Sequence, residues 1–284
     1  MYRALLQSWL RNAAKARVQE AVVQSAREQL APATEEPADE ESKPCRLGVV
    51  FALGIESGGF EDLLQGVATT RGQGFVAREG GLKGQRVVVI LAGAGRDNAA
   101  RATEALIDGH RPRRVVSAGF AGALSPELRR SDILIADALL DPEGGRRSIE
   151  LPPGLSSAAL GPGVHRGVLL TADRVVRLPR EKQSLFQQHG ALAVDMETTA
   201  VAEVCRSREV AFSSVRVIND TSDEVLPTDV EHLLAQTSNA ARLGAAVGAI
   251  WRRPASAKDM YQLRENALVA SDRLARFLAD TQFD

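Results

Sequence analysis

The fold is decided by the stretch Gly48-Val-Val-Phe-Ala-Leu-Gly-Ile-Glu56, in which an apolar run ends at a glycine and is followed by a carboxylate. Polar side chains follow apolar runs in three later stretches: Ser117-Ala-Gly-Phe-Ala-Gly122, Val194-Asp-Met-Glu197 and Val215-Arg-Val-Ile-Asn-Asp220. A short apolar run of this kind is typical of a buried strand. Because α/β proteins build their sites at strand ends, the four stretches predict where the functional side chains lie.

Apolar runs and amphipathic segments alternate along the chain on either side of these stretches. Strands are expected at 47–53, 86–92, 115–118, 133–136, 168–171 and 212–218, and helices at 98–108, 180–189, 197–206 and 230–251, with a short helix beginning at residue 61. The alternation predicts one α/β domain at 46–252, in which helices flank a mixed, largely parallel central sheet in three layers.

Three further segments lie outside the expected domain. Residues 1–30 are interpreted as an amphipathic helical extension, 31–45 as an acidic linker with nothing to bury, and 253–284 as a C-terminal amphipathic helix. The terminal helices either pack on each other or on the domain, or the N-terminal one lies on a membrane through Trp9 and its basic residues. Glu20 and Glu28 dilute its positive face, so packing is the favoured alternative.

Composition excludes several classes of function. The formal net charge is -1, so no basic field indicates a nucleic-acid partner. The two cysteines form no disulfide framework, which fits a reducing cytoplasm. The four histidines lack the spacing of metal ligands, and no apolar run approaches the roughly 20 residues that span a bilayer. We therefore expect a cytoplasmic protein without a metal or organic cofactor.

A glycine turn at Gly93-Ala-Gly95 has the appearance of a dinucleotide-binding loop, because it follows an apolar run and precedes a helical pattern. The third glycine position is Asn98, and the next strand ends at Ser117 without the acid that binds a ribose. An ordinary tight turn between a strand and a helix is the favoured interpretation.

The polar residues of the four stretches are two separate carboxylates, a third beside a methionine, and one arginine. This set suits cleavage of a glycosidic bond, with an acid for the leaving group, a base for water and a carboxylate for sugar hydroxyls. Structural roles are the alternative: Asp220 could close an Asx turn beside an ordinary Arg216 ion pair, and Glu197 could favour a helix dipole. Glu56 could likewise be a loop acid.

In order and spacing, the stretches resemble the nucleoside phosphorylase and nucleosidase superfamily, above all its methylthioadenosine/S-adenosylhomocysteine nucleosidases. The resemblance covers roughly residues 46 to 252. The group's glutamate eight residues after the first strand's glycine is Glu56, and its valine-glutamate-methionine-glutamate motif lies at Val194–Glu197. Its arginine-x-isoleucine-serine-aspartate motif lies at Arg216–Asp220, with Asn219 in place of the serine.

The resemblance implies a role for each matched residue. Asp220 would protonate the departing base at N7, and Glu56 would activate the water with help from Arg216. Glu197 would bind the ribose hydroxyls, and Met196 would pack against the sugar. The other substrate-binding positions that it implies are Gly119, Phe120, Val175, Val176 and Asn219.

Three residues bear on the choice between hydrolysis and phosphorolysis. Phosphorylases that resemble this chain carry an arginine and a serine for phosphate where Ser117 and Phe120 stand here, and an acid at Glu56 would repel phosphate. The sequence therefore predicts a purine nucleosidase acting on a 5′-substituted adenine nucleoside such as methylthioadenosine or S-adenosylhomocysteine. The alternatives are a phosphorylase that uses Arg96, and a non-catalytic nucleoside-binding or scaffold protein. The resemblance also implies a homodimer.

Departures from the group leave the 5′ substituent open. Phe120 replaces the group's usual serine, and Val175 stands where a phenylalanine stacks on the base. Branches that act on futalosine or on adenosylated hopanoids resemble this chain in having an apolar residue at the position of Phe120. The reaction is thus better defined by the sequence than the identity of the 5′ group.

Overall fold

The computed structural model describes residues 45–72, 74–141, 143–156, 161–228 and 254–283. These residues belong to one compact unit, Pro44–Asp284. Residues 1–44 of the extension and linker expected at 1–45, and the helix expected at 230–251, lie outside the described residues.

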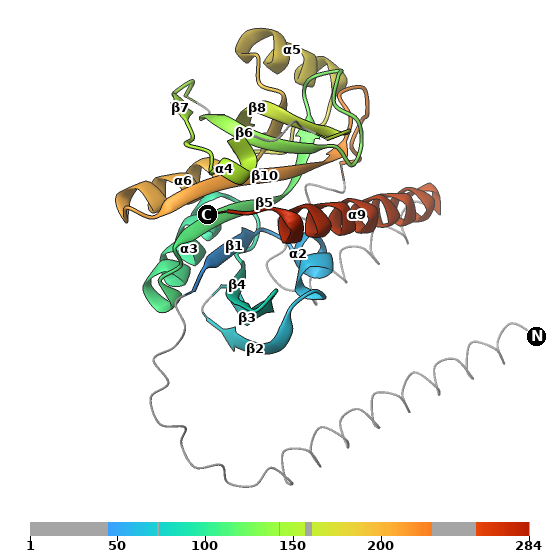
Figure 1. The fold of residues 1–284 in the computed structure, drawn as a ribbon. Coiled ribbons are helices and arrows are strands. Elements are labelled where there is room, and N and C mark those ends of the chain that lie inside the picture. The colour runs from blue at the N-terminus through green and yellow to red at the C-terminus, as the bar shows by residue number, and fades with distance from the viewer. Residues whose placement is uncertain (1–44, 73, 142, 157–160, 229–253, 284) are drawn as a thin grey trace, which may run out of the picture. The chain divides into compact units, whose positions relative to one another are not determined.

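The centre of this unit is a ten-stranded mixed sheet (Figure 1). Its described strands are β1 (Leu47–Phe51), β2 (Gln65–Arg71), β3 (Val76–Leu82), β4 (Gln85–Leu91), β5 (Arg114–Ala123), β6 (Ile133–Leu140), β7 (Arg146–Ser148), β8 (Val164–Thr171), β9 (Ala193–Asp195) and β10 (Ala211–Asp220). The order across the sheet is β10-β6-β8-β9-β5-β1-β4-β3-β2, with β7 on β6 and a further pairing of β10 with β5.

Parallel and antiparallel pairings divide the sheet into two parts. β4, β1, β5 and β10 run parallel, so their carboxyl ends lie at one edge. Because β10 also pairs with β6, the strands β10, β6, β8, β9 and β5 close into a barrel-like ring. The prediction of an α/β fold with a mixed sheet flanked by helices is confirmed.

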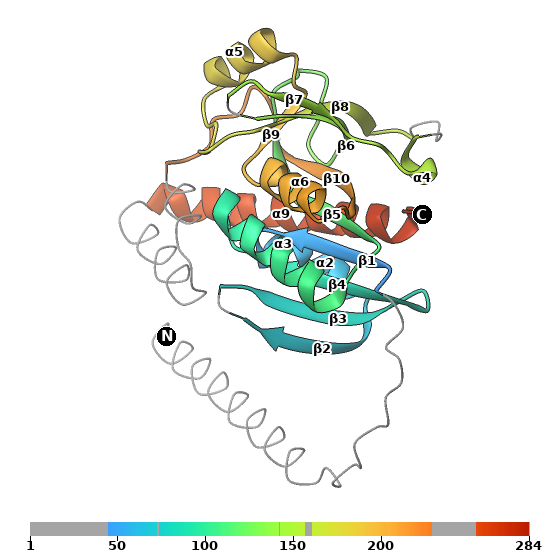
Figure 2. The ribbon, with the colours of Figure 1, turned by 90° about the vertical axis from the view of Figure 1, so that its left-hand side faces the viewer.

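The helices cover the two faces of the sheet. They are α2 (Gly54–Glu61), α3 (Arg96–His110), α4 (Pro153–Ser156), α5 (Pro179–His189), α6 (Thr198–Ser207) and α9 (Pro254–Asp280). In Figure 2, α3 and α6 lie on one face and α2 and α9 on the other. Side chains of β1 alternate accordingly: Val49 and Phe51 pack with Phe60 of α2, whereas Val50 packs with Leu106 of α3.

Four strands and one helix turn carry no apolar run of the expected length, and the sequence does not predict them: β2, β3, β7, β9 and α4. Every residue of β2 is exposed, so its strand form comes from pairing with β3 rather than from burial. The helix expected from residue 61 is wrong in its position, because α2 begins at Gly54 and ends at Glu61. The three glycines of α2 give this segment the sequence pattern of a loop.

Close packing of α9 on α2 explains one of those glycines. A Cβ at Gly59 would lie 3.2 Å from the Ser271 carbonyl oxygen and 3.3 Å from Ala275 Cβ. The Gly59 N–H donates to Ser271 Oγ (3.2 Å), and that hydroxyl donates to the Glu56 carbonyl oxygen (3.1 Å). Although the sequence sets residues 253–284 apart from the domain, α9 packs into the main core and supports the helix that carries Glu56.

Candidate active site

Glu56 lies in the first turn of α2, directly after β1, and is buried with 4% of its surface exposed. Backbone N–H groups hold both of its carboxylate oxygens. Oε1 accepts from Phe120 in β5 (2.9 Å), and Oε2 accepts from Leu53 (2.8 Å). Burial raises the pKa of Glu56, while the nearby Arg216 and the backbone donors oppose the rise.

Gly119 allows Glu56 and Arg216 to approach β5 from the same side. Its φ of 152° is a conformation that side-chain-bearing residues rarely adopt. A Cβ there would lie 2.6 Å from Arg216 Nη1 and 2.8 Å from Glu56 Oε1. The glycine predicted as a substrate contact therefore also makes room for the neighbouring acid and guanidinium.

Arg216 is a fully buried cation in β10. Its Nη2 forms an ion pair with Asp195 Oδ2 (2.6 Å) and donates to Thr198 Oγ1 (2.6 Å) and Ser117 Oγ (2.8 Å). The Asp195 carboxylate also accepts from the Thr171 hydroxyl (2.8 Å). The carboxylate in direct contact with Arg216 is thus Asp195, whereas Glu56 interacts with the guanidinium electrostatically on the same side of Gly119.

The sequence assigns no role to these partners of Arg216. Asp195 belongs to the Val194–Glu197 motif, and Ser117 is a polar residue inside an otherwise apolar strand, which is the only local signal of a buried network. The position of Asp195 in this network depends on the register of β9 against β8, in which Asp195 pairs with Thr171.

Glu197 is the N-cap residue of α6 and is held by the glycine turn after β4. Its Oε1 accepts from the Gly95 N–H (2.7 Å). Burial and the neighbouring Asp195 raise the pKa of Glu197 to about 7. The turn at Gly93–Gly95 thus positions a carboxyl group. Beside it, Met196 lines an open pocket of about 620 Å³ that includes Arg96, which pairs with Asp173 at 3.4 Å.

Asp220 ends β10 and is buried against a lysine that the sequence does not indicate. Lys182 of α5 is completely buried, and its Nζ donates to Asp220 Oδ2 (2.6 Å), the Thr221 carbonyl oxygen (2.6 Å) and the Glu224 carbonyl oxygen (3.3 Å). Burial raises the pKa of Asp220, and Lys182 opposes the rise. A Cβ at Gly122 would lie 2.9 Å from Asp220 Oδ2, so β5 again approaches an acid through a glycine.

The remaining predicted residues occupy different surroundings. Phe120 is half-buried against the main core, and Val176 is buried in a cluster with β8. Val175 is half-buried. The Asn219 side-chain oxygen is buried and has no hydrogen-bond partner among the described residues, while its carbonyl oxygen accepts from Arg130. An acceptor of this kind is available to a donor group of a ligand.

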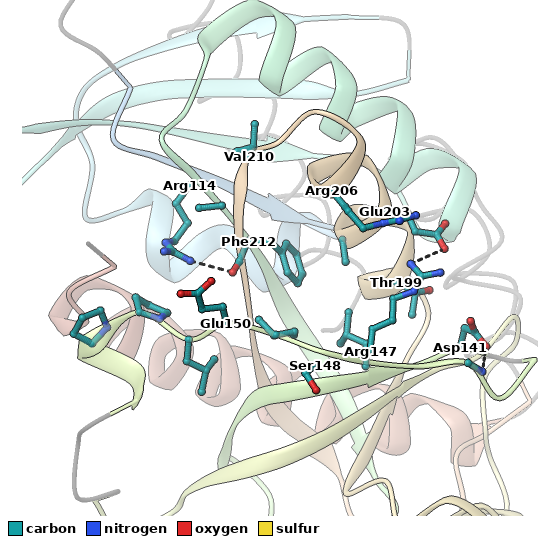
Figure 3. Close-up of a pocket in the computed structure, with 18 residues that line it drawn as sticks. Arg114, Asp141, Arg147, Ser148, Glu150, Thr199, Glu203, Arg206, Val210 and Phe212 are labelled. Carbon is teal, nitrogen blue, oxygen red and sulfur yellow. Dashed lines mark hydrogen bonds and ion pairs between the residues drawn. The ribbon is translucent and has the colours of Figure 1, made fainter.

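A pocket of about 420 Å³ lies between α6, β7 and the beginning of β10 (Figure 3). Its described lining contains none of the predicted site residues. Arg147 pairs there with Glu203 (3.3 Å), and Arg114 donates to the Phe212 carbonyl oxygen (3.0 Å). Because this pocket adjoins the start of β10, it is distinct from the region around Asp220 at the end of that strand.

Across the ranges that the structure describes, no three His, Cys, Asp or Glu side chains are grouped in a way that could hold a metal ion. No helix in those ranges is both long and apolar enough to cross a bilayer.

This chain is similar in sequence to a family of known proteins. The family model described as the Phosphorylase superfamily matches residues 46–251. A 5′-methylthioadenosine/S-adenosylhomocysteine nucleosidase of Bacillus thuringiensis is 25% identical over 215 residues, which cover 68% of this chain and 93% of that protein. An equally similar nucleosidase of the same name occurs in Bacillus anthracis.

Solved structures of nucleosidases with that name share the fold. The Neisseria meningitidis protein in complex with methylthio-immucillin-A has a TM-score of 0.62 at 22% identity, covering 82% of this chain and 98% of that one. The Streptococcus pneumoniae protein with a transition-state inhibitor has a TM-score of 0.63 at 17% identity, covering 82% and 96%. Since the family match spans most of the chain, the protein belongs to the phosphorylase superfamily, whose members act on N-glycosidic bonds.

Proposed function

We propose that the protein is a purine nucleosidase that hydrolyses the N-ribosidic bond of a 5′-substituted adenine nucleoside, such as methylthioadenosine or S-adenosylhomocysteine. The observation that carries this proposal is Asp220, a buried carboxyl group at the end of a parallel strand, whose pKa is raised by burial. A carboxyl group whose pKa is raised keeps its proton to higher pH, and in that protonated form it can serve as a general acid. The 25% identity to nucleosidases acting on these two compounds supports the substrate class.

The chemistry requires an acid on the side of the base. A purine anion leaves poorly, so Asp220 donates its proton to N7 while the electron pair of the C1′–N9 bond moves into the base. The sugar becomes oxocarbenium-like, and nearby carboxylates stabilise its positive charge. Water then adds to C1′, and Glu56 takes the proton that the water loses.

Glu56 suits the role of base because burial, which raises its pKa, is opposed by groups that stabilise its carboxylate. Burial favours the neutral acid, whereas Arg216 and two backbone N–H groups favour the carboxylate. A base is most effective when its pKa lies near the working pH. Arg216, with its Nη2 tied to Asp195, acts in this proposal as a fixed positive charge that keeps Glu56 ionised.

Glu197 suits the ribose hydroxyls. One of its carboxylate oxygens accepts from Gly95, which leaves the other for a hydroxyl group. With a pKa of about 7, the carboxyl group can either accept or donate a hydrogen bond to the sugar. Met196 precedes it and supplies an apolar surface beside that position.

Hydrolysis is favoured over phosphorolysis because Arg216 and Arg96, which could otherwise bind phosphate, contact other side chains. Arg216 is surrounded by Asp195, Thr198 and Ser117, and the Ser117 hydroxyl is bound to its guanidinium. Arg96, the substitute phosphate contact, pairs with Asp173. A phosphate dianion would have to displace these partners and tolerate Glu56, which costs electrostatic free energy.

The test is incubation of the full chain with methylthioadenosine, S-adenosylhomocysteine, adenosine and inosine, with and without phosphate. Chromatography of the products should show free base and free or 5′-substituted ribose, at rates that phosphate does not change. A ribose 1-phosphate product, with turnover that saturates in phosphate, would establish a phosphorylase instead. Nucleoside binding without turnover would establish the non-catalytic alternative.

A further inference from the structure

We propose that Lys182 is a positioning residue for Asp220, which fixes one carboxyl oxygen of the acid and stabilises the carboxylate that forms as the proton leaves for the base. This inference rests on the proposed function, in which Asp220 is the general acid. It concerns a residue of α5 that lies 38 positions away from Asp220 in the sequence.

The complete burial of Lys182 indicates that its ammonium group has specific partners. Lysines are rarely buried completely unless they are paired, because removing an ammonium group from water is costly. Lys182 has no exposed surface, and its three N–H bonds match three acceptors: Asp220 Oδ2, Thr221 O and Glu224 O. An ammonium with three matched acceptors fixes both the acid and the turn that follows it.

The geometry leaves one oxygen of Asp220 for the substrate. Lys182 occupies Oδ2, and the backbone of Gly122 lies against the same oxygen so closely that a Cβ there would be only 2.9 Å away. The absence of a Cβ at Gly122 leaves room for Oδ2, and the contact with Lys182 restricts rotation of the carboxyl group. Oδ1 is the oxygen that remains to carry the proton to N7.

The charge of Lys182 stabilises the buried carboxylate that Asp220 becomes when it loses its proton. A carboxyl group that is only desolvated holds its proton tightly, because the carboxylate left behind would be an isolated buried charge. In the proposed step the Oδ1–H bond breaks, the N7–H bond forms, and the C1′–N9 electron pair enters the base. Asp220 ends as a carboxylate paired with the Lys182 ammonium and regains a proton from the solvent, to which Glu56 gives up the proton that it took from the attacking water.

Other charged groups near Asp220 act in opposing directions. Glu224 raises the pKa of Asp220 and Arg130 lowers it, and these two side chains pair with each other. Asp223 is exposed and accepts from the Thr221 hydroxyl (2.6 Å). Within the residues that the structure describes, Lys182 is thus the cation in direct contact with the acid.

The direction of the pH effect follows from this arrangement. Removing the charge of Lys182 removes a cause that lowers the pKa of Asp220, so the pKa rises further. Because the protonated acid is the active form, the alkaline limb of the kcat/KM profile should move to higher pH. At the same time kcat should fall, because the acid releases its proton less readily and is oriented less well. A lysine that only supports the fold would not move the limb.

Two substitutions and a matched control test the inference. Lys182→Met removes the charge and the donors, whereas Lys182→Gln keeps a donor and removes the charge alone. Lys83→Gln is the control, since exposed Lys83 also bridges a carbonyl oxygen (Ala279, 2.7 Å) and a carboxylate (Asp280, 3.0 Å). We expect kcat to fall about tenfold to a hundredfold in both Lys182 variants, with KM within about threefold, and no change in the control.

The decisive measurement does not depend on turnover. The carboxyl ¹³C resonance of Asp220, assigned by its loss in Asp220→Asn, should titrate at higher pH in Lys182→Gln than in the wild type. An unchanged titration in the folded variant would overturn the inference even if nucleosides are hydrolysed. A raised titration in a protein that hydrolyses no nucleoside would defeat the proposed function and leave the coupling established. If neither variant folds, the wild-type Lys182 ¹⁵Nζ resonance must shift over the interval in which Asp220 titrates, and a constant resonance overturns the inference.

Discussion

Glu56 and Asp220 are both buried acids at the carboxyl ends of parallel strands, but the chain holds them by different means. Backbone N–H groups hold both oxygens of Glu56, and Arg216 acts on it without an ion pair. A side-chain ammonium holds Asp220 directly. Both pKa values are raised by burial, so the difference lies in what stabilises the ionised form.

In the proposed mechanism, this difference suits the two tasks of base and acid. A base must be ionised before the reaction, and preorganised backbone dipoles achieve this without a counter-charge in contact. An acid must become ionised during the reaction, and a paired cation stabilises the charge at that moment. We therefore expect kcat to fall by different factors when Asp220 and Glu56 are each replaced by the neutral amide.

The largest effect is expected for Asp220→Asn. The amide keeps the shape of the side chain but has no proton to give to the leaving base. General acid catalysis is typically worth about 10²–10⁴-fold in rate, so kcat should fall by at least that factor while nucleoside affinity changes little. Steady-state kinetics and calorimetric titration with a substrate analogue measure the two quantities. A variant within a few-fold of the wild type would leave Asp220 as a turn residue only.

Glu56→Gln should reduce kcat by a similar or somewhat smaller factor. The amide oxygen can still accept from one backbone N–H group, but the side chain can no longer take a proton from water. The amide NH₂ would also face either Leu53 N or Phe120 N, both of which are donors, so some local stability is lost. Product formation in single turnovers is the appropriate assay. Retained hydrolysis would remove Glu56 from the mechanism.

Gly119→Ala tests how closely Arg216 and Glu56 approach the backbone of β5. The added Cβ would lie 2.6 Å from Arg216 Nη1 in a backbone conformation that alanine rarely adopts. Strain of this kind costs about 1–3 kcal/mol, and a displaced Glu56 should lower kcat as well. Thermal unfolding gives the first quantity. The control is Gly58→Ala, where a Cβ would meet nothing within 4 Å. Equal stability of the two variants would contradict the tight approach.

The same comparison shows what the sequence could predict. Glu56, Glu197 and Asp220 follow or end an apolar run in the sequence and lie at or just after strand ends in the structure, whereas Arg216 lies inside β10. Lys182 lies in a helix with charged neighbours and has the appearance of a surface residue, and only the contact of α5 with the end of β10 buries it. Local patterns reveal which residues terminate strands, whereas burial of a helical lysine is decided by tertiary packing.

The fold divides in a similar way. Strands with continuous apolar runs, such as β4 and β5, are predicted because burial on both faces leaves a clear signal. The exposed β2 and the glycine-containing α2 are not, because pairing with β3 and contact with α9 stabilise them. The sequence therefore predicts the central strands of the sheet better than the exposed strand β2 and the helix α2.

The smallest effect is expected from removing residues 1–43. The compact unit begins at Pro44, and Cys45 is already part of it: its carbonyl oxygen accepts from Arg113 N (3.0 Å), and its side chain is completely buried. A chain of residues 44–284 should fold and keep kcat within about twofold, because it retains the whole of that compact unit.

Removal of the other terminus should behave differently. A chain ending at residue 253 loses α9, whose Leu274 and Leu278 are buried in the main core and whose Ser271 donates to the Glu56 carbonyl oxygen. Losing two buried leucines alone costs about 2–5 kcal/mol each, which is comparable with the whole stability of a typical domain. Circular dichroism and kcat of the two truncated chains should therefore separate them clearly. If the 44–284 chain were also unfolded or inactive, the N-terminal residues would have to complete the core or a neighbouring subunit's site.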